Sequence, residues 1–244
     1  MARMNPSVVV IISADAEWLE VRKYFTGCKV KHSPYGEWFT HKYNNISNLD
    51  ETVIFMHGGW GKVAASGSTQ YVICQWRPRL IINMGTCGGF DGKINRGDII
   101  FVNKTIIYDI FEQMGDPEDH INYYSAQLDA SWAEAPLPIP VKVSLMVSAD
   151  RDLLTKDIKG LSKKYGAIAG DWESGAIAWV ANKNQTPCLI LRGVTDIVGS
   201  SGGEAYDGNV DIFYQNTELI MKRLLDSMPL WLLKYKERVS SNRK

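Results

Sequence analysis

Cysteine is scarce in this chain of 244 residues, and the spacing of the four cysteines fits neither a metal site nor a disulfide framework. Cys28, Cys74, Cys87 and Cys188 are scattered, with no C-x-x-C pair among them. This spacing argues against a structural zinc site and against a fold stapled by disulfides. We therefore expect reduced thiols in a cytoplasmic protein.

The chain also lacks an excess of charge and a long apolar run. Its 27 basic and 27 acidic side chains balance, so nothing suggests an electrostatic grip on nucleic acid or on a membrane surface. The longest apolar run, Val8–Ile12, is far too short to span a bilayer. Residues 1–14 have a weak likeness to a signal peptide, but the run is short and an acidic helical pattern follows it. We predict a buried strand there and no membrane partner.

Phosphate-binding and dinucleotide motifs are missing as well. The glycine-rich stretches match neither G-x-G-x-x-G nor the Walker pattern, which argues against nucleotide-cofactor and ATP sites. His57 and His120 have no metal-ligand spacing. The sequence predicts no cofactor and no metal.

What the chain does have is an alternation of buried strands with amphipathic helices. Strands are expected at 8–12, 52–56, 79–83, 98–107, 141–147, 167–170 and 188–194. Helices are expected after residue 14 and over 61–76, 173–182 and 210–233, with a polar tail after Lys234. Val63, Ala64, Gly67, Tyr71 and Cys74 are the expected apolar face of the second helix. The alternation predicts an α/β fold, a three-layer αβα sandwich with a central twisted mixed sheet.

One segment does not follow this alternation. Residues 109–140 are rich in Asp, Glu, Pro and Tyr and have weak periodicity, so we expect a long excursion or lid. No internal repeat or linker is visible, and the prediction is one domain over residues 1–244.

Polar residues of interest follow several predicted strands, where open α/β sheets bind their ligands. Glu17 follows the first strand, Gly58–Lys62 the second and Gly85–Gly89 the third. Asp171 and Glu173 follow a later strand, and Asp196 ends the last one. Burying a carboxylate at the end of such an element costs free energy unless the carboxylate has a partner, and such groups are often found in functional sites. The sequence therefore predicts one cleft assembled from separate segments.

Each of these residues also has an ordinary structural interpretation. Asp196 is placed to cap a turn, and Glu173 to complement a helix dipole. Glu17 is of the kind usually solvated on a surface helix, and Arg192 is a candidate structural partner of Asp171 or Glu173. Thr86 is small and polar, and its ordinary interpretation is a hydroxyl side chain in a turn. Cys87 has no accompanying histidine motif, so an inert buried thiol is expected rather than a nucleophile.

Five stretches in a fixed order resemble the nucleoside phosphorylase/nucleosidase superfamily, and among its members the 5'-methylthioadenosine/S-adenosylhomocysteine nucleosidases. The resemblance covers most of the chain apart from roughly residues 109–140. The stretches are Ser13–Glu17, Gly59–Ala65, Ile81–Gly89, Asp171–Glu173 and Arg192–Asp196.

The resemblance implies cleavage of the N-glycosidic bond of an adenosine-type purine nucleoside. It implies that Asp196 is the acid that protonates the purine, that Glu173 binds the ribose hydroxyls, and that Glu17 activates water. Arg192 is the implied fourth catalytic residue and supports Glu17 together with Thr86. The residues implied to bind substrate are Gly85, Thr86, Cys87, Gly88, Asp171, Trp172, Thr195 and Tyr206.

Hydrolysis and phosphorolysis differ in the nucleophile. Hexameric phosphorylases of the superfamily have an arginine where this chain has Asn83, and a glycine loop with Asp-Pro and arginine where it has Ser13–Glu17. A phosphate dianion without guanidinium partners binds poorly, so hydrolysis is favoured. Two alternatives stay open: a phosphate-dependent phosphorylase and a non-catalytic nucleoside-binding module.

Departures from the family leave the nucleoside open. Trp172 replaces a methionine, and the aromatic residue that stacks on the purine is missing from the polar stretch 148–152. Tyr206 matches an aromatic residue near the 5' substituent. The resemblance also implies a homodimer, with apolar material at Ile110, Phe111, Met114, Tyr123, Tyr124 and Trp132 as the candidate contact surface.

Overall fold

A central strand buried on both faces organises the fold. The computed structural model describes residues 7–46, 49–131, 134, 136–206 and 208–241. Strand β1 (Val8–Ile12) lies between β4 (Leu49–His57) and β5 (Leu80–Phe90), and pairs with both in parallel. Because strand side chains alternate, Val8, Val10 and Ile12 enter one core cluster, while Val9 and Ile11 enter another on the opposite face.

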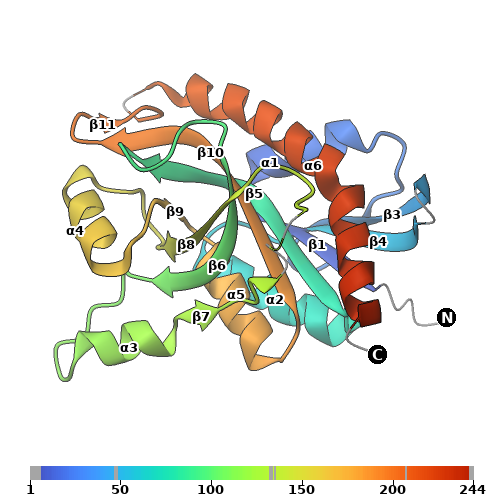
Figure 1. Ribbon diagram of the computed structural model, residues 1–244, viewed down its shortest axis with the longest axis horizontal. Helices are drawn as coiled ribbons and strands as arrows, with labels where there is room; N and C mark the ends of the chain where they lie inside the picture. The colour runs from blue at the N-terminus through green and yellow to red at the C-terminus, as the bar shows by residue number, and fades with distance from the viewer. Residues whose placement is uncertain (1–6, 47–48, 132–133, 135, 207, 242–244) are drawn as a thin grey trace.

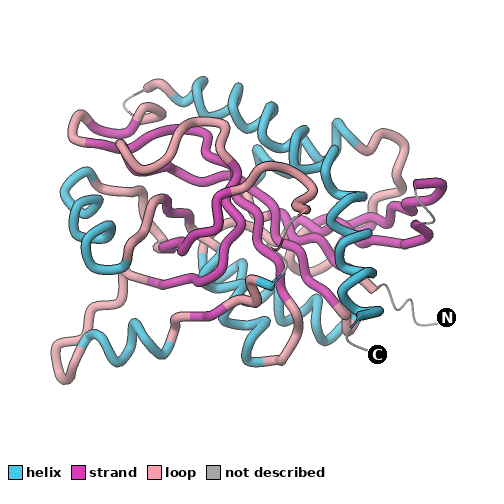
Figure 2. Tube along the Cα trace, in the orientation of Figure 1, coloured by secondary structure: helices cyan, strands magenta, loops and turns pink. Residues whose placement is uncertain are grey.

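Helices cover both faces of this sheet (Figure 1). Helices α1 (Asp15–Tyr24) and α6 (Val210–Ser241) pack on the face of Val8, and α2 (Lys62–Trp76) and α5 (Ser174–Lys183) on the face of Val9. Figure 2 shows the strands as a twisted layer between the helices. The predicted αβα arrangement is confirmed.

The sheet is mixed, as predicted. Its other strands are β2 (Lys31–His32), β3 (Glu37–Ile46), β6 (Ile99–Ile107), β7 (Ala126–Gln127), β8 (Lys142–Ser148), β9 (Ala169–Asp171), β10 (Cys188–Gly199) and β11 (Gly202–Gly203). Strand β10 is parallel to β5 and antiparallel to β6, and β3 is antiparallel to β4. The sequence did not predict β2, β3, β7 or β11.

Part of the sheet closes on itself. Strand β5 pairs with β10, β10 with β6, β6 with β8, β8 with β9, and β9 again with β5. These five strands form a small closed ring, from which β1, β4, β3 and β2 extend as an open sheet. Strand β9, with only three residues, completes the ring.

Two motifs, one expected just beyond a strand and one expected at a strand's end, lie inside strands. Gly85–Gly89 belongs to β5, and Asp196 belongs to β10, which continues to Gly199. The pairing of β10 with β5 shifts register between Val194 and Asp196, where a bulge falls at Thr195. Bulges turn side chains toward a new direction, and many are found next to active sites.

The expected apolar face of α2 is wrong. Val63 is 85% exposed and Cys74 is also exposed. The buried residues of α2 are instead Ala65, Ser68, Thr69, Val72 and Trp76. The Ser68 and Thr69 hydroxyls both donate to the Ala65 carbonyl, which removes the cost of burying them.

The chain's second half has more helix than the sequence predicted. Helix α6 continues through Ser241, well past Lys234. It bends around the molecule (Figure 1) and contains Pro229, which lacks the N–H for a helical hydrogen bond. Residues 109–140 include the short helix α3 (Pro117–Tyr123), and α4 (Thr155–Tyr165) follows β8.

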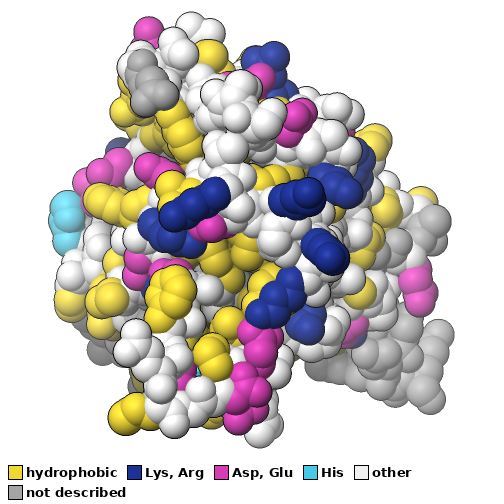
Figure 3. All heavy atoms as spheres, turned by 90° about the vertical axis from the view of Figure 1, so that its left-hand side faces the viewer, with side chains coloured by type: hydrophobic (Ala, Val, Ile, Leu, Met, Phe, Trp, Pro, Cys, Tyr) yellow, Lys and Arg dark blue, Asp and Glu magenta, His cyan; other side chains and the backbone are white. Residues whose placement is uncertain are grey.

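The surface charge is uneven despite the zero net charge. Figure 3 shows Lys and Arg side chains gathered on the side of the molecule that carries α4. Lys93, Lys156, Lys159 and Lys163 line a shallow groove there. In the part of the chain that the structure describes, no helix is long and apolar enough to cross a membrane.

Candidate active site

A cavity of about 380 Å³ lies at one end of the closed ring. Ten of the twelve residues predicted from the sequence line it: Glu17, Thr86, Cys87, Gly88, Asp171, Trp172, Glu173, Thr195, Asp196 and Tyr206. They come from α1, β5, β9, the β9–α5 junction, β10 and the chain beyond β11. The remaining two, Gly85 and Arg192, are not among the lining residues.

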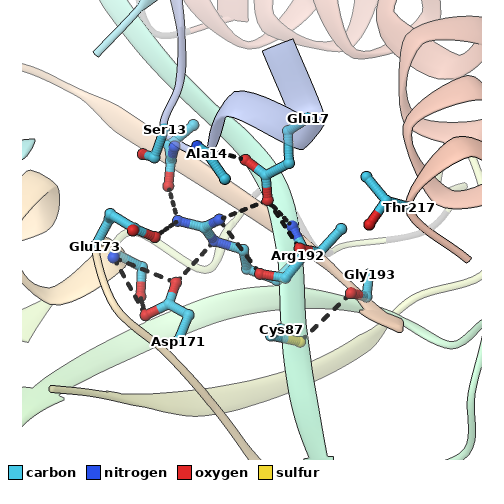
Figure 4. A network of polar contacts seen from close by, with 12 residues as sticks. Ser13, Ala14, Glu17, Cys87, Asp171, Glu173, Arg192, Gly193 and Thr217 are labelled. Carbon is cyan, nitrogen blue, oxygen red and sulfur yellow. Dashed lines mark hydrogen bonds and ion pairs between the residues drawn. The ribbon is translucent and has the colours of Figure 1, made fainter. Parts of the chain in front are cut away.

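Arg192 lies beneath the cavity, fully buried in β10 (Figure 4). Its Nε forms an ion pair with Asp171 Oδ2 at 2.8 Å, and its Nη2 donates to Asn83 Oδ1 at 2.8 Å. Its Nη1 and Nη2 lie 3.8 Å from Glu17 Oε1 and Glu173 Oε2, respectively. Three carboxylates therefore surround one guanidinium, which compensates part of the cost of their burial and leaves an excess of negative charge in the cluster.

Gly85 makes room for this cluster. A Cβ atom at Gly85 would lie 2.6 Å from Glu17 Oε1 and closer still to Arg192 Nη1. Any side chain at this position would therefore force Glu17 and Arg192 apart. The role of Gly85 is to let β5 approach the buried ion cluster, since only glycine lacks the obstructing atom.

Glu17 is 2% exposed, so the interpretation as a solvated surface residue is wrong. Its Oε1 accepts hydrogen bonds from Thr86 N at 2.6 Å and from Thr86 Oγ1 at 2.9 Å. Its Oε2 accepts a bond from Ala14 N at 3.2 Å. These donors hold the carboxylate at the cavity wall in a fixed orientation, as a base that positions a water molecule requires.

Asp171 and Glu173, at the start of α5, have different hydrogen-bond partners and different roles. Asp171 accepts hydrogen bonds from Ser174 N and Oγ and from Ser148 Oγ, so it anchors the helix N-terminus to β8. Glu173 is directed to the cavity and accepts a bond from Gly61 N at 2.9 Å. Burial raises the pKa of Glu173, with Arg192 opposing that shift and Asp171 and Glu17 adding to it.

Asp196 lies on the bulge of β10 and is mostly buried. Thr195 Oγ1 donates to its Oδ1 at 2.7 Å. Burial raises the pKa of Asp196, the Thr195 hydrogen bond opposes this shift, and the charges of Glu204 and Asp152 add to it. A carboxyl group with a raised pKa retains its proton at higher pH, which suits a general acid.

The Cys87 thiol is buried, and its Sγ donates to the Gly193 carbonyl at 3.6 Å. Burial raises the pKa of Cys87 well above the usual value, so the thiolate is disfavoured. A thiol in this state is a poor nucleophile, which agrees with the expectation of an inert residue.

Several lining residues were not predicted: Ala14, Trp60, Arg151, Asp152, Leu153, Gly170, Ala205, Val210 and Phe213. Trp60 follows β4, and residues 151–153 follow β8, so the rule that ligands bind beyond strand ends applies to them too. Val210 and Phe213 lie at the beginning of α6, and no motif marks them. Their spacing of three residues is typical of any helix face.

The charge of the lining limits what the cavity can bind. It contains the carboxylates of Glu17, Asp152, Asp171, Glu173 and Asp196. Arg151 is the one basic side chain among the described lining residues, and its Nη2 is paired with Asp157 at 2.5 Å. Within the described ranges, no three His, Cys, Asp or Glu residues are grouped to hold a metal ion. The cavity therefore suits a neutral or electron-poor ligand better than an anion.

The fold is that of an α/β protein with a mixed sheet, and a buried ion cluster lies against its candidate active site. Comparison with known proteins gives the family. The model of the phosphorylase superfamily matches residues 8–228, and the chain belongs to that family.

The chain is similar to a 5'-methylthioadenosine/S-adenosylhomocysteine nucleosidase from Marinomonas sp. (strain MWYL1). The two are 24% identical over 234 residues, which cover 90% of this chain and 98% of the relative. A solved structure of a putative nucleosidase of the same name from Francisella philomiragia has a TM-score of 0.74 at 14% identity, covering 91% of this chain and 98% of that one. Futalosine hydrolase from Helicobacter pylori also has a TM-score of 0.74, at 15% identity, covering 92% and 98% of the two chains.

Proposed function

We propose that this protein hydrolyses the N-glycosidic bond of an adenosine-type purine nucleoside and releases the free base. 5'-Methylthioadenosine, S-adenosylhomocysteine or a relative is the proposed substrate. The curated relatives that it resembles carry the name of the corresponding nucleosidase. The observation that carries the proposal is the placement of three carboxylates, Glu17, Glu173 and Asp196, around one cavity with a buried arginine beneath two of them.

The proposed reaction gives each of the three carboxylates a role. Asp196 donates its proton to N7 of the purine, and the bond between N9 and C1' breaks with its electron pair going to the base. The ribose develops positive charge, which the carboxylates of Glu173 and Glu17 stabilise. Glu17 accepts a proton from water as the water oxygen bonds to C1'. The products are the free base and the ribose with its 5' substituent.

Water is favoured over phosphate as the nucleophile. The guanidinium of Arg192 is already surrounded by Asp171, Glu17 and Glu173, and Arg151 is paired with Asp157. A phosphate dianion entering the cavity would face carboxylates without a cation to pair with. A phosphorylase is the second candidate, and a nucleoside-binding module without activity is the third.

One experiment separates the three. The purified protein is incubated with adenosine, 5'-methylthioadenosine and S-adenosylhomocysteine, with and without phosphate, and free base is measured by chromatography. Release without phosphate supports the hydrolase, and release only with phosphate supports the phosphorylase. Binding in calorimetry without release supports the binding module.

We further propose that the protein acts as a homodimer in the cytoplasm. The apolar side chains of Phe111 and Met114 are 83% and 96% exposed, and Tyr123 is also exposed. Large exposed apolar side chains on one segment are typical of interaction surfaces. Trp132, named with them in the sequence, lies outside the described residues. The cysteines in the structure are free thiols, in keeping with a reducing compartment.

A further inference from the structure

An aromatic corner, formed by Trp60 and Trp172, occupies one part of the cavity wall. The two indole rings lie 5.5 Å apart between centroids, with their planes at 61°. Trp60 follows β4 and is 60% exposed, and Trp172 is half-buried directly before Glu173. Both line the cavity, so ring surface remains available to a ligand.

The corner is held beside Glu173 by the backbone. Gly61, the residue after Trp60, donates from its N–H to Glu173 Oε1 at 2.9 Å. The next residue, Lys62, donates from its N–H to Asp150 Oδ1 at 2.6 Å, and its side chain forms an ion pair with Asp109. These bonds fix the Trp60 loop in place while leaving its indole exposed.

Asp196 has different neighbours. It lies near Gly88 and Leu153. A Cβ atom built on Gly88 would be 3.8 Å from Asp196 Oδ2 and 3.0 Å from the Leu153 side chain. The cavity thus has an acid end at Asp196, a polar centre at Glu17 and Glu173, and the aromatic corner next to Glu173. A nucleoside with its base at Asp196 and its ribose hydroxyls on Glu173 leaves two apolar parts of the wall for its 5' substituent. They are the aromatic corner and the side formed by Tyr206, Val210 and Phe213, and the corner is the part that the Gly61 hydrogen bond holds next to Glu173.

We propose that Trp60 and Trp172 make this site selective for nucleosides whose 5' substituent carries a flat aromatic ring. The inference rests on the proposed function. A ring placed in the corner contacts one indole by its face and the other by its edge, whereas a methylthio group contacts the indoles through one sulfur and one methyl. The cations nearby, Lys62 and Arg151, are paired with Asp109 and Asp157. The corner therefore favours an uncharged ring over a carboxylate or phosphate.

The test compares two probes, 5'-phenylthio-5'-deoxyadenosine and 5'-methylthioadenosine, in both kcat/KM and Kd. The unmodified protein is expected to prefer the phenylthio probe by roughly tenfold, the size of one or two aromatic contacts. Trp60→Ala and Trp172→Met are each expected to reduce that preference to about twofold. The matched control is Trp179→Ala, which removes an indole paired with Tyr123 at 5.9 Å and 56° outside the cavity lining and should keep the preference.

The outcomes distinguish this inference from the proposed function. If base is released but the two probes are used equally well, the proposed selectivity of the aromatic corner is wrong and the proposed hydrolase still stands. The same holds if both tryptophan variants retain the preference. If no probe is hydrolysed, the proposed function fails, and the ratio of the two Kd values still decides whether the corner selects an aromatic ring. Absence of binding by either probe overturns both. Circular dichroism spectra of each variant guard against misfolding.

Discussion

Asp196 is the residue on which the proposed chemistry depends most directly. We expect Asp196→Asn to reduce kcat by roughly 10²–10⁴-fold, because an amide cannot deliver a proton to N7. Kd for the nucleoside should change little, since the amide still forms hydrogen bonds with the purine. Steady-state kinetics and calorimetry check this pair of effects. Turnover close to that of the unmodified protein would show that Asp196 is not the acid.

We expect the charged form of the buried Glu173 side chain to lower the stability of the folded protein. Burial raises its pKa in the folded state, so the folded protein binds a proton at this site more tightly than the unfolded chain does. The resulting stabilisation is complete below the unfolded pKa of about 4.3 and is lost as pH rises through the folded value. Glu173→Gln keeps the Gly61 hydrogen bond and removes the buried charge.

The variant Glu173→Gln should therefore gain stability relative to the unmodified protein, and the gain should grow as pH rises from 5 to 8. Its binding and turnover should both decline, because ribose hydroxyls and the developing cation lose their carboxylate. Thermal unfolding over this pH range and kinetics at one pH measure the two effects. A difference in Tm that is constant with pH would contradict the buried-charge argument.

Asp152 acts on Asp196 from a distance. Burial is the main cause of the raised pKa of Asp196, and the negative charges of Glu204 and Asp152 increase the shift. Asp152→Asn removes one of these charges and should lower the pKa of Asp196. A general acid loses activity as pH rises through its pKa, so the alkaline limb of the kcat profile should move to lower pH. Glu204→Gln should move the limb in the same direction, and Asp129→Asn, on the remote excursion, should leave it in place.

At the scale of single elements, β5 shows how a strand is shaped around the ion cluster. Gly85→Ala would place a methyl group against Arg192 and Glu17, and overpacking of this kind costs about 1–3 kcal/mol. Gly160→Ala is the matched control, because a Cβ at this position of α4 meets no atom within 4 Å. In a helix interior that change should stabilise by about 0.5–1 kcal/mol. Denaturant unfolding measures both, and equal effects would refute the steric role of Gly85.

Of the strands that the sequence predicted, β1, β5 and β10 are buried along nearly all of their length. β1 was predicted with its observed bounds because a run of Val and Ile has few alternatives to such a strand. β3 was missed because it is an antiparallel strand away from the centre, and its polar and aromatic residues carry no long apolar run. α4 was missed because four of its eleven residues are lysines and its buried face consists mainly of Leu161.

The part of the site that lies near strand ends could be predicted from the sequence. The rule that ligands lie beyond the carboxyl ends of strands predicts that Glu17, Glu173 and Asp196 share one cleft, and all three line the cavity. The rule does not tell which side chains line a cavity and which support it from below. Arg192 was grouped with the catalytic residues, and the structure shows it fully buried and surrounded by three carboxylates from other segments, contacts that its place near a strand end does not reveal.

At the scale of the whole molecule, the prediction concerns association. If the exposed Phe111 and Met114 lie in a dimer contact, light scattering should give twice the chain mass of 27.4 kDa at micromolar concentration. The double variant Phe111→Ser, Met114→Ser should shift the protein toward monomer. The matched control is Leu219→Ser, an exposed apolar residue on α6, which should leave the mass unchanged. A monomer for the unmodified protein would refute the dimer.

The closed ring of strands has a consequence for the order in which the molecule folds. β9 must join β5 and β8, and its partners on β5 are about eighty residues earlier in the chain. Pairings between such distant segments form late, because the entropy of closing a long loop must first be overcome. Asp171 ends β9 and connects it to Arg192, so the ion cluster is completed only when the ring closes. During refolding, recovery of secondary structure should therefore precede recovery of nucleoside binding.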